Sequence, residues 1–197
     1  MITQEIASKI RGLSSTKKPI LIGIEGFGGS GKSTLAEKLK QLLPNAKTIK
    51  IDAFILKEPA QNAEPWEQVF DRKRLEKQVL EPASHNQDVS YQRLEWAENT
   101  LSPSIELPKA DYLIIDGISS YHPEIEHYYD FKIWVNAPIE VAKQRGHQRD
   151  SDNENAVLWD KWAQCDLDYQ EKYHPEQKAD FIVDNGEQQD EQTRFTK

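Results

Sequence analysis

Residues 26–33 hold the side chains whose spacing most clearly predicts a chemistry. They read Gly-Phe-Gly-Gly-Ser-Gly-Lys-Ser and match the pattern G-x-x-x-x-G-K-[ST]. The glycines let backbone N–H groups turn inward and approach phosphate oxygens closely. A helix that begins at the end of such a loop directs its positive end and its free N–H groups at the same anion. The segment therefore predicts a phosphate-binding loop (P-loop) for a nucleoside triphosphate.

The flanking residues favour this interpretation over a flexible Gly/Ser surface turn. An apolar run at residues 20–24 precedes the loop and a helix-prone run at residues 35–40 follows it, which is the strand–loop–helix setting that the motif requires. Lys32 is expected to reach the β- and γ-phosphates, and the Ser33 hydroxyl is expected to ligate Mg²⁺. The predicted nucleotide-binding residues are Gly26, Phe27, Gly28, Gly29, Ser30, Gly31, Lys32, Ser33 and Thr34.

Three carboxylates, Asp52, Asp116 and Asp184, each follow a predicted strand. If the sheet is parallel, Asp52 and Asp116 emerge at the same edge as the P-loop. Phosphoryl transfer needs Mg²⁺ on the phosphates, a carboxylate that accepts the proton of the attacking hydroxyl, and cations near the developing charge. We expect Asp116 to organise Mg²⁺ and Asp52 to be the base. The alternative is that each acid only caps a turn, and Asp184, before Asn185-Gly186, is interpreted in that way.

Two arginines lie on one face of a predicted helix over residues 139–150. Arg145 and Arg149 are four residues apart, so their guanidinium groups repel each other unless water or an anion lies between them. Phosphate could supply that anion. We therefore expect residues 139–155 to form a lid that closes over the nucleotide and excludes water. Arg145, Arg149, Lys32 and Asp52 make up the predicted catalytic residues.

The elements that must position these groups alternate along the chain. Strands are predicted at residues 20–25, 47–51, 111–115, 131–135 and 181–183, and helices at 2–13, 32–43, 66–80, 139–150 and 155–173. Pro82 is expected to end the third of these helices. Residues 85–108 are polar and proline-punctuated, which favours a hairpin or an insertion on the substrate side. Alternating strands and helices predict one α/β domain, residues 1–197, with a parallel sheet. Within it, residues 54–108 are expected to bind the acceptor and residues 187–197 to be a polar tail.

The composition limits the partners. A formal net charge of −8 argues against general binding to nucleic acid or to an anionic membrane. No signal sequence or membrane-spanning run is evident, so a soluble, cytoplasmic protein is expected. The single cysteine, Cys165, is interpreted as a packing residue. The histidines show no metal-binding spacing and are expected at the surface: His85, His122, His127, His147 and His174. The oligomeric state is left open.

The order of these motifs resembles the uridine kinase-like branch of P-loop kinases, a group that is similar to phosphoribulokinase and bacterial pantothenate kinase. The matching segments cover most of residues 18–185, and they are residues 26–34, 51–54, 114–117, 129–138, 145–150 and 179–183. The resemblance implies a P-loop NTPase three-layer fold with a five-stranded parallel sheet and a small helical lid. It also implies ATP and Mg²⁺, with transfer of the γ-phosphoryl group to a hydroxyl of a small nucleoside-like or sugar-like metabolite.

The family pattern places its proposed base on Asp52 and its metal-organising acid, usually Glu, on Asp116. Phe70-Asp71 resembles the segment that contacts sugar hydroxyls. Uridine kinases have an aromatic residue and a histidine in a pyrimidine-binding hairpin, whereas this chain has Tyr91 without that histidine, so the acceptor is left open. The predicted substrate-side residues are Asp52, Phe54, Asp71, Tyr91 and Arg93.

Two other functional classes are weighed against the kinase. One is a P-loop NTPase with a regulatory rather than a metabolic role, a switch or GTPase, for which an Asn-Lys-x-Asp guanine-specificity motif would be expected; that motif is absent from the sequence. A module that binds a nucleotide without catalysis is disfavoured because Lys32, Asp52 and Asp116 are all present, although this does not exclude it.

Overall fold

The computed structural model describes residues 2–13, 19–56, 65–95 and 97–186. The predicted polar tail lies outside the described residues, as do residues 57–64 and 96 of the predicted acceptor-binding insertion. None of the helices in the described part of the chain combines the length and the apolar character that a bilayer crossing requires.

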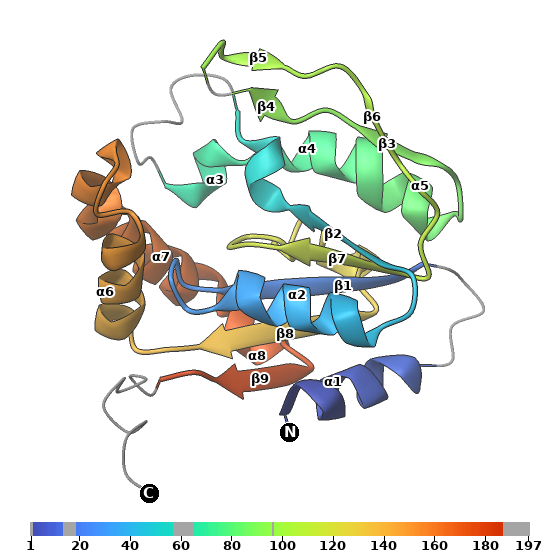
Figure 1. The fold of residues 1–197 in the computed structure, drawn as a ribbon, viewed down its shortest axis with the longest axis horizontal. Coiled ribbons are helices and arrows are strands. Elements are labelled where there is room, and N and C mark those ends of the chain that lie inside the picture. Colours follow the sequence, from blue (N-terminus) through green and yellow to red (C-terminus); the bar gives the residue numbers. More distant parts are fainter. Residues whose placement is uncertain (1, 14–18, 57–64, 96, 187–197) are drawn as a thin grey trace, which may run out of the picture.

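Five parallel strands form the central sheet, in the spatial order β2-β7-β1-β8-β9 (Figure 1). Each forms close to its predicted bounds: Ile20–Gly26 (β1), Ala46–Lys50 (β2), Tyr112–Asp116 (β7), Phe131–Asn136 (β8) and Phe181–Asp184 (β9). The predicted α/β fold with a five-stranded parallel sheet is therefore confirmed.

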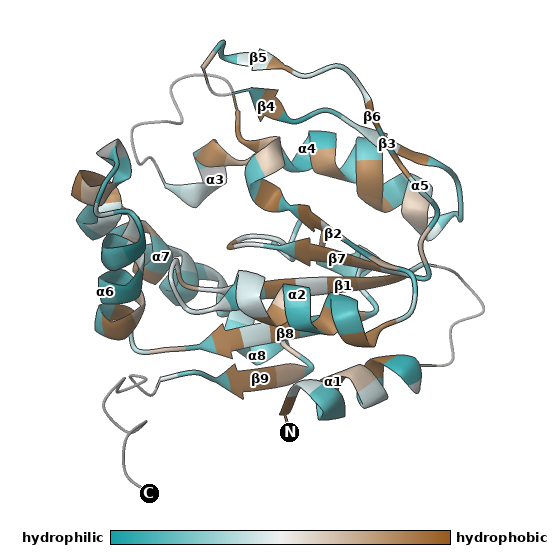
Figure 2. Ribbon diagram, viewed as in Figure 1, coloured by the Kyte–Doolittle hydropathy of each residue, from teal (hydrophilic) through white to brown (hydrophobic). Residues whose placement is uncertain are grey.

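Helices cover both faces of the sheet. α1 (Ile2–Arg11) and α2 (Lys32–Leu42) pack on one face, in a core that includes Leu39 and Ile114. Figure 2 shows largely hydrophobic strands between helices in which hydrophobic and hydrophilic residues alternate. Strands that are buried on both faces need apolar residues at nearly every position, which explains why the sequence predicted them so directly.

On the opposite face, α7 (Trp159–Tyr173) contributes Tyr169 to a second core, which also contains Trp134 and buried residues of the segment 69–83. The predicted helix over residues 155–173 begins with a 3₁₀ segment, η5 (Glu154–Leu158), and becomes α-helical only at Trp159. The other elements in this half are η4 (Glu126–Tyr128), α6 (Ile139–Arg149) and α8 (Pro175–Lys178).

The helix predicted over residues 66–80 is wrong as a single element. α3 (Trp66–Val69) ends at Phe70, whose extended backbone forms an isolated bridge with Ile55. Asp71 then starts α4 (Arg72–Leu75), because its carboxylate accepts a hydrogen bond from the Arg74 amide at 3.0 Å. An N-capping acid of this kind begins a new helix rather than continuing an old one.

The expected stop before Pro82 is also wrong. The chain passes from α4 through a π-helical segment, η3 (Glu76–Leu80), into α5 (Glu81–Ser84). In η3 the Glu81 amide bonds to the Glu76 carbonyl, five residues back. A proline ring normally clashes with the carbonyl four residues before it, and the wider π-helical spacing changes the carbonyl positions ahead of Pro82.

Four short strands within residues 85–108 form two nested antiparallel pairs beside this helical segment, so that the inner hairpin is enclosed by the outer pair (Figure 1). In one, β3 (Val89–Tyr91) pairs with β6 (Ile105–Leu107), and in the other β4 (Leu94–Glu95) pairs with β5 (Thr100–Leu101). The predicted hairpin character is confirmed.

One of the five histidines departs from its predicted surface position. His122 is only 4% exposed, and the centroid of its ring lies 4.6 Å from that of Tyr173. The aromatic side chains of α7 cover it, and nothing in the local sequence reveals that contact. The other four histidines are exposed.

Replacing Leu39 by alanine should lower the free energy of unfolding by about 2–5 kcal/mol, because its fully buried side chain fills the space between α2 and the sheet. Urea denaturation followed by circular dichroism measures the change. The matched control is Lys38→Ala at the exposed neighbouring position, which should stay within about 0.5 kcal/mol. Equal effects of the two substitutions would contradict the assignment of this core.

Candidate functional site

The parallel register brings three segments together at the carboxyl edge of the sheet. Ile24 of β1 pairs with Asp116 of β7, and Lys50 of β2 pairs with the same residue. The P-loop follows β1 directly, and η1 (Ile51–Phe54), which contains Asp52, follows β2. The edge therefore gathers the loop and both acids predicted to act with it.

The P-loop fits tightly against its neighbours. Gly29 and Gly31 have φ angles of 81° and 100°, which side-chain-bearing residues rarely adopt. A Cβ atom on Gly29 would also overlap the main-chain carbonyl of Ala142 in α6. The Lys32 ammonium donates to the Phe27 carbonyl at 2.8 Å, so this cation lies over the loop. The result is a glycine-shaped cradle with a positive charge beside it, as a phosphate site requires.

Ser33 and Asp116 form a pair of oxygen donors at the start of α2. The Ser33 hydroxyl donates to Asp116 Oδ2 at 2.6 Å. Asp116 is 3% exposed, and its Oδ1 atom is buried without a hydrogen-bond partner in the described part of the chain. A buried carboxylate oxygen that lacks a partner suits a hard cation such as Mg²⁺.

The protein does not enclose such a cation by itself. Among the described residues, no group of three or more His, Cys, Asp or Glu side chains is placed to hold a metal. Mg²⁺ usually keeps waters and binds through one or two protein oxygens together with substrate phosphates. The Ser33–Asp116 pair fits that arrangement.

Asp52 follows β2 at this edge, and its side chain remains open to solvent although protein surrounds much of its carboxylate. The surrounding protein desolvates the carboxylate and raises its pKa, although the charge of Lys32 acts in the opposite direction. The negative charge of Asp116 raises the pKa further. A carboxylate with a raised pKa holds a proton more readily than an ordinary aspartate, as a general base must.

The two arginines of α6, Arg145 and Arg149, have different partners. Arg145 donates to the Asn185 carbonyl at 2.9 Å, beside β9. Arg149 pairs with Asp150 through two hydrogen bonds of 3.0 and 3.1 Å, and its charge also lowers the pKa of Asp52. Although the two residues share a helix face, they do not converge on one point in this structure.

The predicted substrate-side residues divide into two groups. The rings of Phe54 and Tyr91 have centroids 5.8 Å apart, and the Asp71 amide donates to the Phe54 carbonyl at 2.7 Å, so these three lie together. Asp71 also caps α4, as described above. Arg93 is mostly exposed and its Nε donates to Glu95 at 3.0 Å, an interaction confined to its own hairpin.

Asp166 in α7 is an acid beside the P-loop that the sequence interpretation missed. It is 2% exposed, its Oδ2 accepts the Gly28 N–H at 2.6 Å, and its Oδ1 accepts the indole N–H of Trp66 at 2.7 Å. The signal was present in the helical spacing, because Asp166 falls on the same face as the buried residues Trp159, Ala163 and Tyr169.

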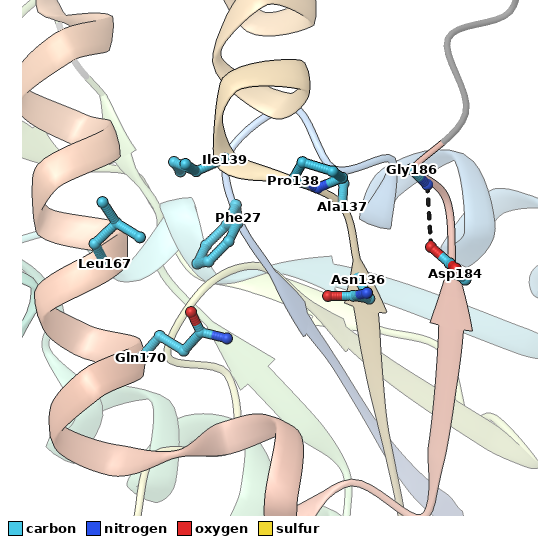
Figure 3. A pocket seen from close by; sticks show the side chains of 9 residues that line it. All are labelled: Phe27, Asn136, Ala137, Pro138, Ile139, Leu167, Gln170, Asp184 and Gly186. Atoms are coloured by element: carbon cyan, nitrogen blue, oxygen red, sulfur yellow. Dashed lines mark hydrogen bonds between the residues drawn. The ribbon is translucent and has the colours of Figure 1, made fainter.

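A cavity of about 540 Å³ lies beside the P-loop, on the face of the sheet covered by α7 (Figure 3). Phe27, Leu167 and Gln170 line one side of it, and the ends of β8 and β9 line the other. At the end of β9, Asp184 accepts the Gly186 amide at 3.2 Å, which fits the turn role expected of this acid.

Glu25, the residue before the P-loop, is a second buried acid that the sequence interpretation did not single out. It has no solvent exposure, and its Oε1 accepts the Tyr121 amide at 2.7 Å and the Tyr169 hydroxyl at 3.3 Å. Desolvation by burial raises its pKa from 4.5 to about 8, although these hydrogen bonds and the charge of Lys32 act to lower it. The folded protein therefore holds a proton on Glu25 at neutral pH.

This proton makes stability depend on pH. Below pH 4.5 the carboxyl is protonated in both states, whereas between 4.5 and about 8 only the folded state keeps the proton. Ionisation then favours the unfolded chain progressively, so stability falls as pH rises through this window. Glu25→Gln should show a smaller fall in urea stability between about pH 5 and pH 8. An exposed control, Glu37→Gln, should keep the parent slope, and a Glu25→Gln slope equal to the parent's would refute the buried proton.

Comparisons with known proteins agree with this geometry. The model of the phosphoribulokinase/uridine kinase family matches residues 21–191. The chain is 25% identical over 150 residues to a uridine kinase from Lactobacillus helveticus, a match that covers 70% of this chain and 71% of that protein. It is 27% identical over 161 residues to a nicotinamide riboside kinase from Saccharomyces cerevisiae, covering 68% and 67%. The chain spans only 31% of the uridine-cytidine kinase C of Dictyostelium discoideum, at 23% identity over 138 residues and 66% of this chain.

Among solved structures, a "possible uridine kinase" from Bacillus stearothermophilus has the same fold, with a TM-score of 0.69. The alignment covers 92% of this chain and 97% of that one at 18% identity, so it supports the fold alone. The match to the family model covers far more than half of the sequence, including the P-loop, Asp52 and Asp116. The chain therefore belongs to the phosphoribulokinase/uridine kinase family.

Proposed function

We propose that this protein is an ATP-dependent kinase that transfers the γ-phosphoryl group to a hydroxyl of a small metabolite. The observation that carries the proposal is the arrangement at one sheet edge, where a glycine cradle, the Ser33–Asp116 pair and Asp52 lie together. Phosphoryl transfer depends on positioning and on charge stabilisation rather than on covalent chemistry by the protein, and this edge supplies both.

Each residue has a distinct task in this proposal. The loop amides bind the phosphates, and Lys32 leaves the Phe27 carbonyl to contact the β- and γ-phosphoryl oxygens. Ser33 and Asp116 would hold Mg²⁺, and the cation would neutralise negative charge on the phosphates. Asp52 accepts the proton of the attacking hydroxyl, and its raised pKa favours that step.

The arginines of α6 are proposed to serve the nucleotide separately. Arg149, whose charge reaches Asp52, is the candidate for the transferred phosphoryl group. Arg145, beside Asn185 at the end of β9, is the candidate for a part of the nucleotide farther from the reaction. Closure of residues 139–155 over the site would exclude water and limit hydrolysis of ATP.

The acceptor proposed is nucleoside-like or sugar-like. Relatives are named for uridine and for nicotinamide riboside, which both carry a ribose hydroxyl. In this chain the half-buried Tyr91 ring, with the buried Phe54 ring packed beside it, is the candidate contact for a planar group. Asp71, whose carboxylate also accepts hydrogen bonds from Arg74, is the candidate acceptor for hydroxyls. The absence of the histidine expected after Tyr91 leaves bases other than uracil open to test.

Asp52→Asn should keep ATP affinity while turnover falls by a factor on the order of 10²–10⁴, because the amide cannot accept the proton. Calorimetry measures ATP binding, and a panel of nucleosides, sugars and related alcohols measures turnover. In the parent protein, activity should decline as the pH falls, because protonation of Asp52 removes the base. Since the pKa of Asp52 is raised above the ordinary value of 3.8, the decline should begin at a higher pH than an ordinary aspartate would give. Asp88→Asn, at an exposed acid in β3's hairpin, is the control. Transfer by Asp52→Asn at the parent's rate would exclude the base assignment.

Asp116→Asn should weaken the dependence of ATP binding on Mg²⁺ without abolishing binding of metal-free ATP. The substitution keeps the hydrogen bond to Ser33 within reach but removes the charge that attracts the cation. Titrations with ATP in the presence of Mg²⁺ or of a chelator measure the difference. If magnesium improves ATP affinity equally in the parent and in Asp116→Asn, this acid does not organise the metal.

A further inference from the structure

Asp166 forms hydrogen bonds to two segments that lie far from it in the sequence. Its two carboxylate oxygens accept separate donors: the Gly28 amide of the P-loop at 2.6 Å and the Trp66 indole at 2.7 Å. The donors are 138 and 100 residues away in the sequence. Trp66 is the first residue of α3, on the proposed acceptor side, so a single buried side chain touches both halves of the site.

Stability alone is a poor explanation for this acid. A carboxylate that is 2% exposed loses most of its hydration, and this desolvation raises its pKa to about 6 even though Lys32, Gly28 and Trp66 act to lower it. Replacing a buried charged group by an apolar side chain of similar volume is often neutral or stabilising. The feature that an apolar residue could not reproduce is the pair of directed hydrogen bonds.

α7 braces the P-loop at two further points. Tyr169, one turn after Asp166, donates to Glu25 immediately before the loop. Trp159, at the start of α7, lies so close to Gly28 and Gly146 that a Cβ atom on either glycine would meet its ring. The P-loop therefore packs against α7 on both sides of its contact with Asp166.

On the other side, Trp66 is connected to the candidate acceptor residues. Its ring lies 5.7 Å from that of Phe70, centroid to centroid. Phe70 precedes Asp71, whose amide donates to the Phe54 carbonyl. The Trp66 indole is thus connected through short contacts to Phe54 and Asp71.

We propose that Asp166 is a positioning residue that couples the acceptor-side segment, through Trp66, to the P-loop, through Gly28. When phosphates occupy the loop, the Gly28 amide and Asp166 adjust together, and the Trp66 indole follows. Because coupling between two sites is reciprocal, an acceptor held beside Phe70 and Asp71 strengthens nucleotide binding through the same side chain. The coupling to nucleotide rests on the proposed kinase function, whereas the tie between Gly28 and Trp66 does not.

The tie is tested first without nucleotide, by ¹H–¹⁵N NMR of the full chain. Five tryptophans give indole signals, and Trp66→Phe assigns the relevant one while keeping an aromatic ring. We expect Trp66→Phe to shift the Gly28 amide signal, and Asp166→Asn to shift both the Gly28 amide and the Trp66 indole. Asp168→Asn, at an exposed acid two residues along α7, should shift neither. A Gly28 signal unchanged by Trp66→Phe overturns the proposal.

The second arm adds magnesium and a non-hydrolysable ATP analogue, with calorimetry on the same samples. In the parent and in Asp168→Asn, binding should move the Trp66 indole signal, and in Asp166→Asn this response should be largely lost although the analogue still binds. A response of the same size in Asp166→Asn overturns the proposed coupling. If the parent binds no analogue, the kinase function fails, while a tie seen in the first arm still establishes Asp166 as the link between the two segments.

Discussion

The parallel pairing of β1 with β7 and β8 is the constraint on which the rest of the site depends. It places the ends of these strands at one edge, so the loop after β1 meets Asp116 at the end of β7. Pairing of β2 with β7 adds Asp52 to the same edge. A shift of one residue in either register would turn the acids toward the opposite face. The buried isoleucines and leucines that fix the register therefore also fix the distances on which the chemistry depends.

The same edge concentrates acidic side chains in a place where a charge is costly. Glu25, Asp116 and Asp166 are all buried next to a loop that carries a single lysine, and burial raises the pKa values of Glu25 and Asp166. Their hydrogen bonds come from main-chain amides, two hydroxyls and an indole rather than from cations. Neutral polar groups, not cations, therefore donate the hydrogen bonds to these carboxyl groups. The Lys32 ammonium is not consumed in an ion pair with any of them and stays available for phosphate.

Much of this arrangement was predictable from the sequence, and the exceptions have physical causes. The strands and the P-loop were predictable because apolar runs and glycine spacing are local signals. The break at Phe70 was not, because a cap by Asp71 and a bridge from Phe70 to Ile55 override helical propensity. The contacts of Asp166 and the burial of His122 were also hidden, because each is created by segments far apart in the sequence. The positions of Arg145 and Arg149 were given by helix spacing, but their partners depend on Asn185 and Asp150, which periodicity does not report.

The close contact between α6 and the P-loop determines which part of α6 can move. At Gly29 the nearest neighbours of a Cβ atom would be main-chain atoms of Ala142 and Gly146, and Gly146 in turn rests on the ring of Trp159. No side chain lies between the two backbones at this point, so the first part of α6 cannot move without moving the P-loop. The closure proposed for residues 139–155 must accordingly be a movement of the part that follows Gly146, which contains Arg149 and the turn at residues 150–153, while the first part of α6 stays with the P-loop.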